Sequence, residues 1–502
     1  MEKKETETKM EEKKETRTTR KTRTTRPNLP RPVLTRPARI LCIVLGWRVE
    51  IFRTRSVRGG KGWPIIGEAL EYVMANKNGT PEKFITDRMR KYSPEVFRTS
   101  LLGENFAVFC GASGNKLLFS SENKLVTTWW PRSMEKMVLF PNYVGYSAKV
   151  ETAKIHALRP EFLNPEALQR YIPIMDSMSK QHLETDWSPC KQVKVFPLLK
   201  KYTFAVACRL FLNIKGHDQV SRLAYPFSLV SAGLISIPIN LPGTAFSRAI
   251  KGGKLIRKEL LGIIRKRKME LSENIGSAQV DLLSHMLLRR DENGRGMEEK
   301  EIAHIIIAFF IASYDTLGAA ITVVLNFLAK FPQVYSNVLK EQKEIAKSKG
   351  KDELLNWENI QKMKYSWNMA CEAMRLAPPA QGVFGEVITD FSYAGFTIPN
   401  GWKTYWTVNS THKNPEYFPD PEKFDPSRFE GRGPPPYTFV PFGGGPRLCP
   451  GKEYARVEIL TFMHNVVTKF KLEKVNPNEK FIYNLSPIPE NGLLVHLHPL
   501  NN

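Results

Sequence analysis

The sequence predicts one large, mainly α-helical domain with a minor β region, preceded by a segment of different composition. Helical spacing of apolar residues dominates from 165 to 347 and again from 452 to 470. Strand-like segments are confined to 105–110 and to parts of 378–406. The chain has 502 residues, 42% of them hydrophobic, which is enough for a sizeable core. We expect the domain to span residues 62–502.

Residues 1–61 have the composition of a basic, disordered segment. Glu, Lys, Thr and Arg alternate up to Arg26, and proline and arginine follow. The net charge of +24 comes partly from this segment, but neither aromatic interleaving nor a base-reading motif accompanies it, so we expect no nucleic-acid partner. The apolar stretch 40–47 is far shorter than a membrane span, so this chain shows no hydrophobic anchor there.

The segment 225–246 combines many apolar residues with two prolines, Pro238 and Pro242. One interpretation is an ordinary core helix. The other is a lid that dips into a membrane and admits lipophilic ligands.

A long apolar run, 302–329, is interrupted by Ala312-Ser-Tyr-Asp315-Thr316. Its length permits a membrane span, yet a carboxylate in the middle of a bilayer is costly. We therefore expect a buried helix of the domain. An adjacent acid and hydroxyl are also a chemically suitable pair for relaying protons.

Three charged residues follow at Glu372, Arg375 and Arg428. The first two lie one helical turn apart on the same face. A pair at this spacing is usually exposed and stabilises the fold by less than ~1 kcal/mol. The alternative is a buried triad, in which the loss of one partner would leave an unpaired charge.

The segment Phe442-Gly-Gly-Gly-Pro-Arg447-Leu-Cys449-Pro-Gly451 places one cysteine in a glycine-rich loop before a helical pattern. Glycines such as Gly445 and Gly451 let the backbone approach a flat ligand. A helix N-terminus lowers the pKa of a thiol and favours a metal-binding thiolate, which on haem iron promotes O–O cleavage. The alternative for a lone cysteine is a small buried hydrophobe. The six cysteines show no paired spacing, which indicates reduced thiols in a protein that faces the cytosol.

The pattern Phe-x-x-Gly-x-Arg-x-Cys-x-Gly, together with Glu372-x-x-Arg375 and the 312–316 segment, resembles the motifs of the cytochrome P450 family. The resemblance implies a single haem-thiolate domain with heme b, iron protoporphyrin IX, bound through Cys449. It implies the following roles: Phe442, Gly445, Gly451, Arg447 and His156 in cofactor binding, Asp315 and Thr316 over the iron as catalytic residues, Glu372, Arg375 and Arg428 as a structural triad, and Trp129, Trp130, Phe309, Ala312 and Val383 in the substrate pocket.

Two positions depart from the family pattern in ways that concern the haem propionates. His156 stands where the resemblance leads us to expect arginine, and Gly385 stands where a second arginine would follow a phenylalanine. Arg447 is then left with more of the charge pairing, which predicts weaker haem retention.

Phrases such as 165–171, 241–244 and 449–456 resemble plant oxidases of the β-amyrin 28-monooxygenase type, whereas 312–316 resembles taxane hydroxylases. The resemblance implies a monooxygenase that hydroxylates or successively oxidises a lipophilic terpenoid, such as the triterpene β-amyrin. The alternatives are a taxane-type diterpene hydroxylase and a catalytically impaired relative that acts as a binding protein. It also implies electrons from NADPH-cytochrome P450 reductase, contact with a membrane surface, a location on the cytosolic face of the endoplasmic reticulum, and a monomer.

Overall fold

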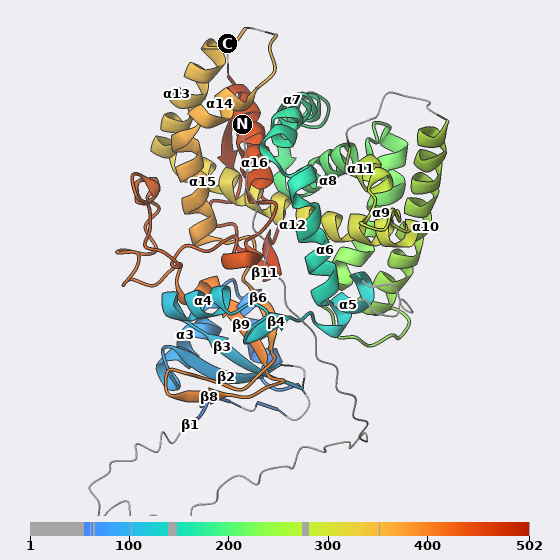
Figure 1. Cartoon of the computed structure of the whole chain (residues 1–502). Helices are drawn as coiled ribbons and strands as arrows, with labels where there is room; N and C mark the ends of the chain where they lie inside the picture. Colours follow the sequence, from blue (N-terminus) through green and yellow to red (C-terminus); the bar gives the residue numbers. More distant parts are fainter. Residues whose placement is uncertain are drawn as a thin grey trace, which may run out of the picture. The chain divides into compact units, whose positions relative to one another are not determined.

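The computed structural model describes residues 55–500, apart from 61, 64–65, 102, 139–147, 274–280 and 351. The described residues belong to one compact unit (Figure 1). Most of the segment expected to be disordered, 1–61, lies outside the described residues. Its end does not, because strand β1 (Arg55–Ser56) pairs in parallel with β8 (Phe396–Ile398). The folded domain therefore includes residues ahead of position 62.

The expected fold class, mainly α with a minor β region, is confirmed. Helices account for most of the described chain: α2 (Ala69–Lys77), α3 (Pro81–Lys91), α4 (Gly111–Ser120), α5 (Arg132–Val138), α6 (Ala148–Phe162), α7 (Pro165–His182), α8 (Val195–Leu212), α9 (His217–Gly233), α10 (Ala245–Ser272), α11 (Leu282–Leu288), α12 (Glu299–Lys330), α13 (Pro332–Lys347), α14 (Trp357–Lys362), α15 (Lys364–Leu376) and α16 (Lys452–Lys469). Helix α16 begins at the residue that the sequence pattern predicts.

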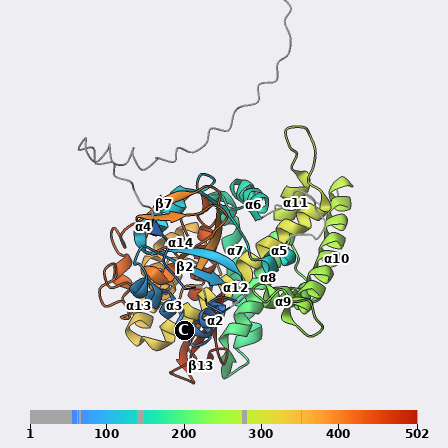
Figure 2. The same cartoon turned by 90° about the horizontal axis from the view of Figure 1, so that it is seen from below.

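The largest sheet has five strands in the order β2-β3-β9-β6-β4. Its strands are β2 (Val96–Leu101), β3 (Glu104–Phe109), β4 (Val126–Thr128), β6 (Gly382–Val387) and β9 (Lys403–Thr407). These strands are labelled in Figure 1, and Figure 2 shows β2 from below. Strands β3 and β9 pair in parallel, and the other pairs are antiparallel. Strands from the two ends of the chain thus form one wall beside the helices. The smaller sheets contain β1, β8 and β7 (Phe391–Tyr393), then β10 (Phe470–Lys474), β13 (Leu494–Pro499) and β5 (Gln192–Lys194), and finally β11 (Phe481–Asn484) with β12 (Ser486–Pro489).

Helix α12 is the central element of the hydrophobic core. By length and composition it could cross a membrane, but 78% of its most apolar window is buried inside the protein. Helices α8, α10, α15 and α16 pack against it. Acidic residues in its first turn, Glu299 and Glu301, complement the positive end of the helix dipole. The 302–329 run is therefore a core helix, as the sequence predicts.

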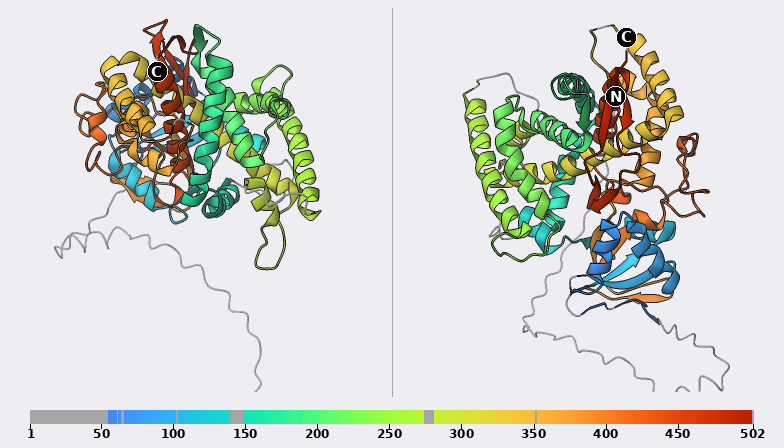
Figure 3. Two further views of the ribbon diagram at one scale, coloured as in Figure 1. Left: turned by 90° about the horizontal axis from the view of Figure 1, so that it is seen from above. Right: turned by 180° about the vertical axis from the view of Figure 1, so that it is seen from behind.

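The segment 225–246 combines buried positions with an exposed link between two helices. Phe227, Leu234 and Phe246 are buried, and α9 and α10 lie side by side (Figure 3). The link between the two helices carries four exposed aliphatic residues, which we call the apolar loop: Ile235, Ile237, Ile239 and Leu241. Thr244 ends the link by accepting a 3.1 Å hydrogen bond from the backbone of Ser247, which caps α10.

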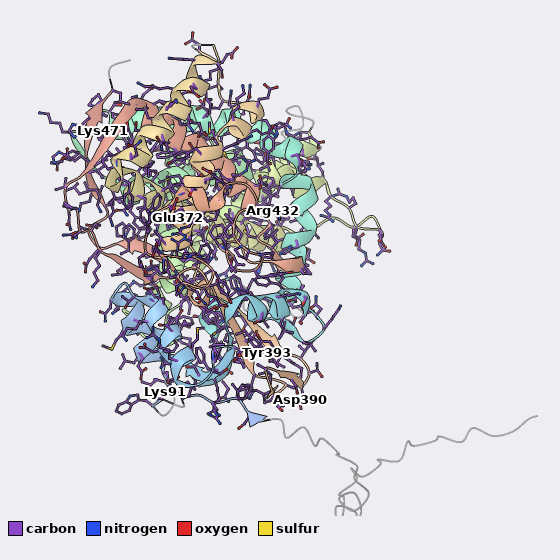
Figure 4. The ribbon with its side chains drawn as sticks, turned by 90° about the vertical axis from the view of Figure 1, so that its left-hand side faces the viewer. Lys91, Glu372, Asp390, Tyr393, Arg432 and Lys471 are labelled. Atoms are coloured by element: carbon purple, nitrogen blue, oxygen red, sulfur yellow. The ribbon has the colours of Figure 1, made fainter. Side chains whose placement is uncertain are left out.

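A buried ion pair joins α15 to the long connection that follows the sheet. The Arg375 guanidinium donates to both carboxylate oxygens of Glu372, at 2.7 and 2.8 Å, and to the carbonyl of His412 at 2.7 Å. Neither side chain of the pair is exposed, and Glu372 lies inside the helical part of the protein (Figure 4). Arg428, the expected third member, approaches Glu372 at 3.5 Å and is partly exposed. The pair is therefore an interior clamp and not a surface interaction.

Removal of the arginine should leave a buried, unpaired carboxylate. We expect Arg375→Leu to lower the free energy of unfolding by about 3–5 kcal/mol, the usual effect of breaking a buried pair. Arg428→Leu is the matched control. It should lower the free energy of unfolding much less, because the Arg428 guanidinium lies 3.5 Å from Glu372 and is partly exposed. Denaturant unfolding of the two variants measures the difference. Equal losses would contradict the central role of Arg375.

Candidate active site

A cavity of about 420 Å³ lies between α12, the sheet and the loop that precedes α16. Helix α12 contributes Phe309, Ala312 and Thr316 to its wall, and the loop contributes Arg447 and Cys449. Most of the lining is apolar, so the cavity suits a large hydrophobic group. The structure therefore brings together residues that are more than a hundred positions apart in the sequence.

The cysteine loop holds Cys449 at the floor of this cavity. The backbone amide of Cys449 donates to the carbonyl of Phe442 at 2.9 Å, which closes the loop. Gly445 has a φ of +65°, and a β-carbon there would lie 2.1 Å from the carbonyl oxygen of Phe119. The structure thus requires glycine at 445 for close packing against α4, whereas the sequence analysis assigned this residue to the cofactor. Gly451 does line the cavity.

The expected lowering of the Cys449 pKa is wrong. Burial raises the pKa of the thiol, and this effect exceeds the opposite influence of the hydrogen bond from the Gly451 backbone. Helix α16 starts only at Lys452, so Pro450 precedes the helix instead of occupying its first turn. A metal that binds here therefore displaces a tightly held proton, as metal-binding thiols generally do.

Arg447 lines the cavity, but it already has an acidic partner. Its guanidinium forms an ion pair with Glu122, and burial raises the pKa of that carboxyl. His156 lies on α6 and does not belong to the described cavity lining. Gly385 does line it, yet a β-carbon there would meet Thr404 Oγ1 at 2.6 Å, so an arginine could enter only if the sheet shifted. Of the two departures from the family pattern, Gly385 therefore lies in the cavity lining, whereas His156 lies outside the described lining.

The two expected catalytic residues of α12 point to different surroundings. Thr316 lines the cavity, and its hydroxyl donates to the carbonyl of Ala312 at 2.6 Å. Asp315 is absent from the described lining. Its carboxylate instead pairs with Lys200 of α8 at 2.8 Å and accepts a hydrogen bond from Ser231 of α9. Asp315 thus joins three helices, and Thr316 alone of the two reaches the cavity.

Three of the five expected pocket residues line the cavity: Phe309, Ala312 and Val383. Trp129 and Trp130 do not appear among the described lining residues. Trp129 instead packs edge-on against Phe106 and Phe384 behind the wall, with ring centroids 5.7 and 6.1 Å apart. The sequence did not reveal the part of the lining that α4 and the sheet supply, namely Leu118, Phe119, Thr127, Phe384, Thr404 and Trp406. Alternation of inward and outward residues along β9 was the available signal.

The donor set fits a metal carried by a planar cofactor. A single thiol faces an apolar cavity, with the amide of Gly451 directed at the sulfur. A β-carbon at Gly451 would meet only the Cys449 sulfur, at 3.9 Å, so glycine leaves a cradle that a side chain would fill. Among the described residues, no cluster of three or more His, Cys, Asp or Glu could hold a bare ion. A single thiol that faces an apolar cavity fits the one protein ligand of a haem-thiolate site.

The comparison with known families agrees with this class. The model of the family described as Cytochrome P450 matches residues 57–495. The chain therefore belongs to the cytochrome P450 family, and it is a monooxygenase. Membership implies a haem iron and electrons from a redox partner.

Similar proteins are known from several plants. The chain is 57% identical to a β-amyrin 6-β-monooxygenase from Solanum lycopersicum over 88% of its length and 92% of the relative. It is 56% identical to a β-amyrin 28-monooxygenase from Vitis vinifera, over 93% of the chain and 97% of the relative. Among solved structures, a retinoic-acid-bound cyanobacterial CYP120A1 superposes with a TM-score of 0.79 at 31% identity, over 89% of this chain and all of that chain.

The iron ligand can be tested against a second buried cysteine. Cys449→Ser should abolish the thiolate-type carbon monoxide difference spectrum of the reduced protein. Cys371→Ser should preserve it, because burial raises the pKa of Cys371 to about 12 and Cys371 is outside the described cavity lining. Spectra of equal amounts of folded protein check this. An unchanged spectrum in Cys449→Ser would exclude Cys449 as the ligand.

Proposed function

We propose that the chain hydroxylates or successively oxidises a pentacyclic triterpene of the β-amyrin type. The observation that carries this proposal is the presentation of Cys449 to a mostly apolar cavity that Thr316 also lines. The names of the relatives support the triterpene over the taxane alternative. Relatives of 57% identity are named for two different positions, 6-β and 28, so identity alone does not select the oxidised carbon.

Each site residue then has a defined task. Cys449 would ligate the iron of heme b, and the bound haem would supply dioxygen activation. Arg447 is the cation available for a propionate, in competition with Glu122. Phe442 lines the cavity near the sulfur and would exclude water from it. Thr316 would hold a proton at its hydroxyl in the cavity lining.

Asp315 is a positioning residue in this proposal. It cannot donate directly to the cavity while its carboxylate is bound to Lys200 and Ser231. Its pairing instead fixes the rotation of α12 about its axis, and so fixes the direction of the neighbouring Thr316 hydroxyl.

Electrons would come from NADPH through a flavoprotein reductase. Lys452 is exposed at the start of α16, close in sequence to the iron ligand, and offers a positive contact for an acidic partner. Arg456 is a weaker candidate, because it pairs with Glu453 at 2.8 Å and is only 17% exposed. The docking face thus depends on Lys452 more than on Arg456.

The apolar loop would contact the cytosolic surface of the endoplasmic reticulum membrane. Its four aliphatic side chains are 43–60% exposed. The neighbouring helix α10 presents Lys251, Lys254 and Lys258 to solvent, which favours anionic headgroups. This face would also bring a lipophilic substrate close to the protein.

The substrate proposal is tested by turnover. The full chain, reconstituted with haem, a plant P450 reductase and NADPH, should convert β-amyrin to products one or more oxygen atoms heavier, which mass spectrometry and NMR identify. A taxadiene-type diterpene is the competing substrate, and Cys449→Ser is the negative control. Turnover of the diterpene but not of β-amyrin would overturn the triterpene assignment. Haem binding without turnover of either would favour a binding protein.

The hydroxyl of Thr316 should govern how efficiently electrons reach product. Thr316→Ala should raise hydrogen peroxide release per NADPH consumed on the order of tenfold, since one positioned proton donor is lost. Thr316→Ser keeps the hydroxyl and should remain near the parent. Parallel assays of NADPH, peroxide and product decide the point. Equal coupling in the parent and the alanine variant would remove Thr316 from proton handling.

The apolar loop should control membrane affinity. Replacing Ile237 and Ile239 together by serine should weaken partitioning onto anionic phospholipid vesicles by on the order of 1–2 kcal/mol per side chain. The matched control replaces Leu354 and Val475, which are 40% and 41% exposed elsewhere on the protein. Sedimentation with vesicles measures both. Similar losses in the two double variants would show that the loop is not the contact.

A further inference from the structure

A buried carboxyl on α16 has no role in the site described so far. Glu458 is fully buried. Neither of its carboxylate oxygens has a hydrogen-bond partner of acceptable geometry among the described residues. Buried carboxyl groups are nearly always hydrogen-bonded, so an orphan of this kind requires an explanation.

Two more orphan groups share its helix face. The hydroxyls of Tyr454 and Thr461 are buried and also lack a partner within the described part of the chain. Positions 454, 458 and 461 follow the i, i+4, i+7 spacing that aligns side chains along one side of a helix. None of these four polar atoms has a hydrogen bond of good geometry among the described residues, although Tyr454 and Glu458 lie close to each other. Buried water is the usual partner of such groups.

Tyr454 connects this row to the active site. It lines the cavity that Cys449 and Thr316 also line. Glu458 lies one turn further along α16, near enough for the two side chains to influence each other's pKa. The row therefore begins at the cavity wall and leads into the protein interior.

No cation compensates for Glu458 among the described neighbours. Helix α7 contributes Tyr171 and Asp176, and α8 contributes Tyr202. The Asp176 carboxylate is already neutralised by Lys180 at 2.9 Å. Burial accordingly raises the pKa of Glu458 to about 8. The side chain thus carries a proton at neutral pH.

We propose that Tyr454, Glu458 and Thr461 form an internal water-binding site that stores a proton on Glu458 and passes it to the cavity through the Tyr454 hydroxyl. Glu458 releases its proton to the Tyr454 oxygen directly or through water, while the hydroxyl proton of Tyr454 moves to an acceptor in the cavity. Solvent then reprotonates Glu458. Reduction of one oxygen atom to water consumes protons, so the proposal extends the monooxygenase activity.

Infrared spectroscopy of the haem-loaded enzyme tests storage without any substrate. At neutral pH the parent should show the carbonyl stretch of a protonated carboxyl, and Glu458→Gln should lack it. Glu358→Gln, which removes an exposed carboxyl on α14, is the matched control and should retain the band. Transfer to D2O should shift the band downward, because the water site exchanges its protons. An absent band overturns storage, and a band that does not shift overturns hydration.

Stability against pH gives an independent check. A carboxyl whose folded pKa lies above its unfolded pKa makes the folded state less stable as pH rises between the two values. The window for Glu458 runs from its ordinary value of 4.5 to about 8. Glu458→Gln should therefore gain stability relative to the parent as pH rises through this window. A constant difference would contradict the neutral, buried state of Glu458.

Delivery is tested with Tyr454→Phe, which keeps the ring and removes only the hydroxyl. Its kcat should fall on the order of tenfold and its solvent isotope effect on kcat should rise, while KM stays unchanged. The loss is partial because the Thr316 hydroxyl can still provide protons. The Glu458 infrared band should persist in this variant. A kcat and an isotope effect equal to those of the parent would overturn proton delivery through Tyr454. If Glu458→Gln does not fold, the shift of the parent's infrared band in D2O still tests proton storage.

Discussion

The pairing of Glu372 with Arg375 is the constraint on which the position of the active-site loop depends. A fully buried charge is tolerated only when nearly all of its hydrogen-bonding capacity is used. Arg375 meets this condition by reaching outside its own helix, to the carbonyls of His412 and Lys423. The connection between the sheet and the cysteine loop is thereby fixed to α15. The loop that presents Cys449 begins from a clamped point, although it contains little regular structure itself.

Polarity is divided sharply around the cavity. Its wall is mostly apolar, and each charged group at or behind the wall has a partner: Arg447 pairs with Glu122 in the lining, and Asp315 pairs with Lys200 behind it. Isolated charges are costly in such surroundings, so each is neutralised locally. The groups left over for chemistry are neutral hydroxyls and a thiol. This division suits oxidation of a hydrocarbon, because the charges that reach the lining are paired with each other.

Motifs that act locally could be read from the sequence, whereas contacts between distant segments could not. The fold class, the start of α16 and the burial of α12 followed from composition and spacing. The direction of Asp315 did not, because one residue turns a helix by about 100° and α12 is apolar on all sides. The Arg447–Glu122 pair joins residues 325 positions apart. The raised pKa of Cys449 escaped prediction because burial outweighed its backbone hydrogen bond.

The hydrogen bond between Ser231 and Asp315 connects α9, which leads into the exposed apolar loop, to α12, which lines the cavity. Ser231 lies two residues before the end of α9, where the apolar loop begins, and Asp315 precedes the cavity-facing Thr316. This bond ties α9 to α12 next to the cavity-lining Thr316. The apolar loop therefore lies close in sequence to one partner of this hydrogen bond, and the Thr316 hydroxyl lies close to the other. Lys200 of α8 forms an ion pair with the same carboxylate, so a third helix joins this connection.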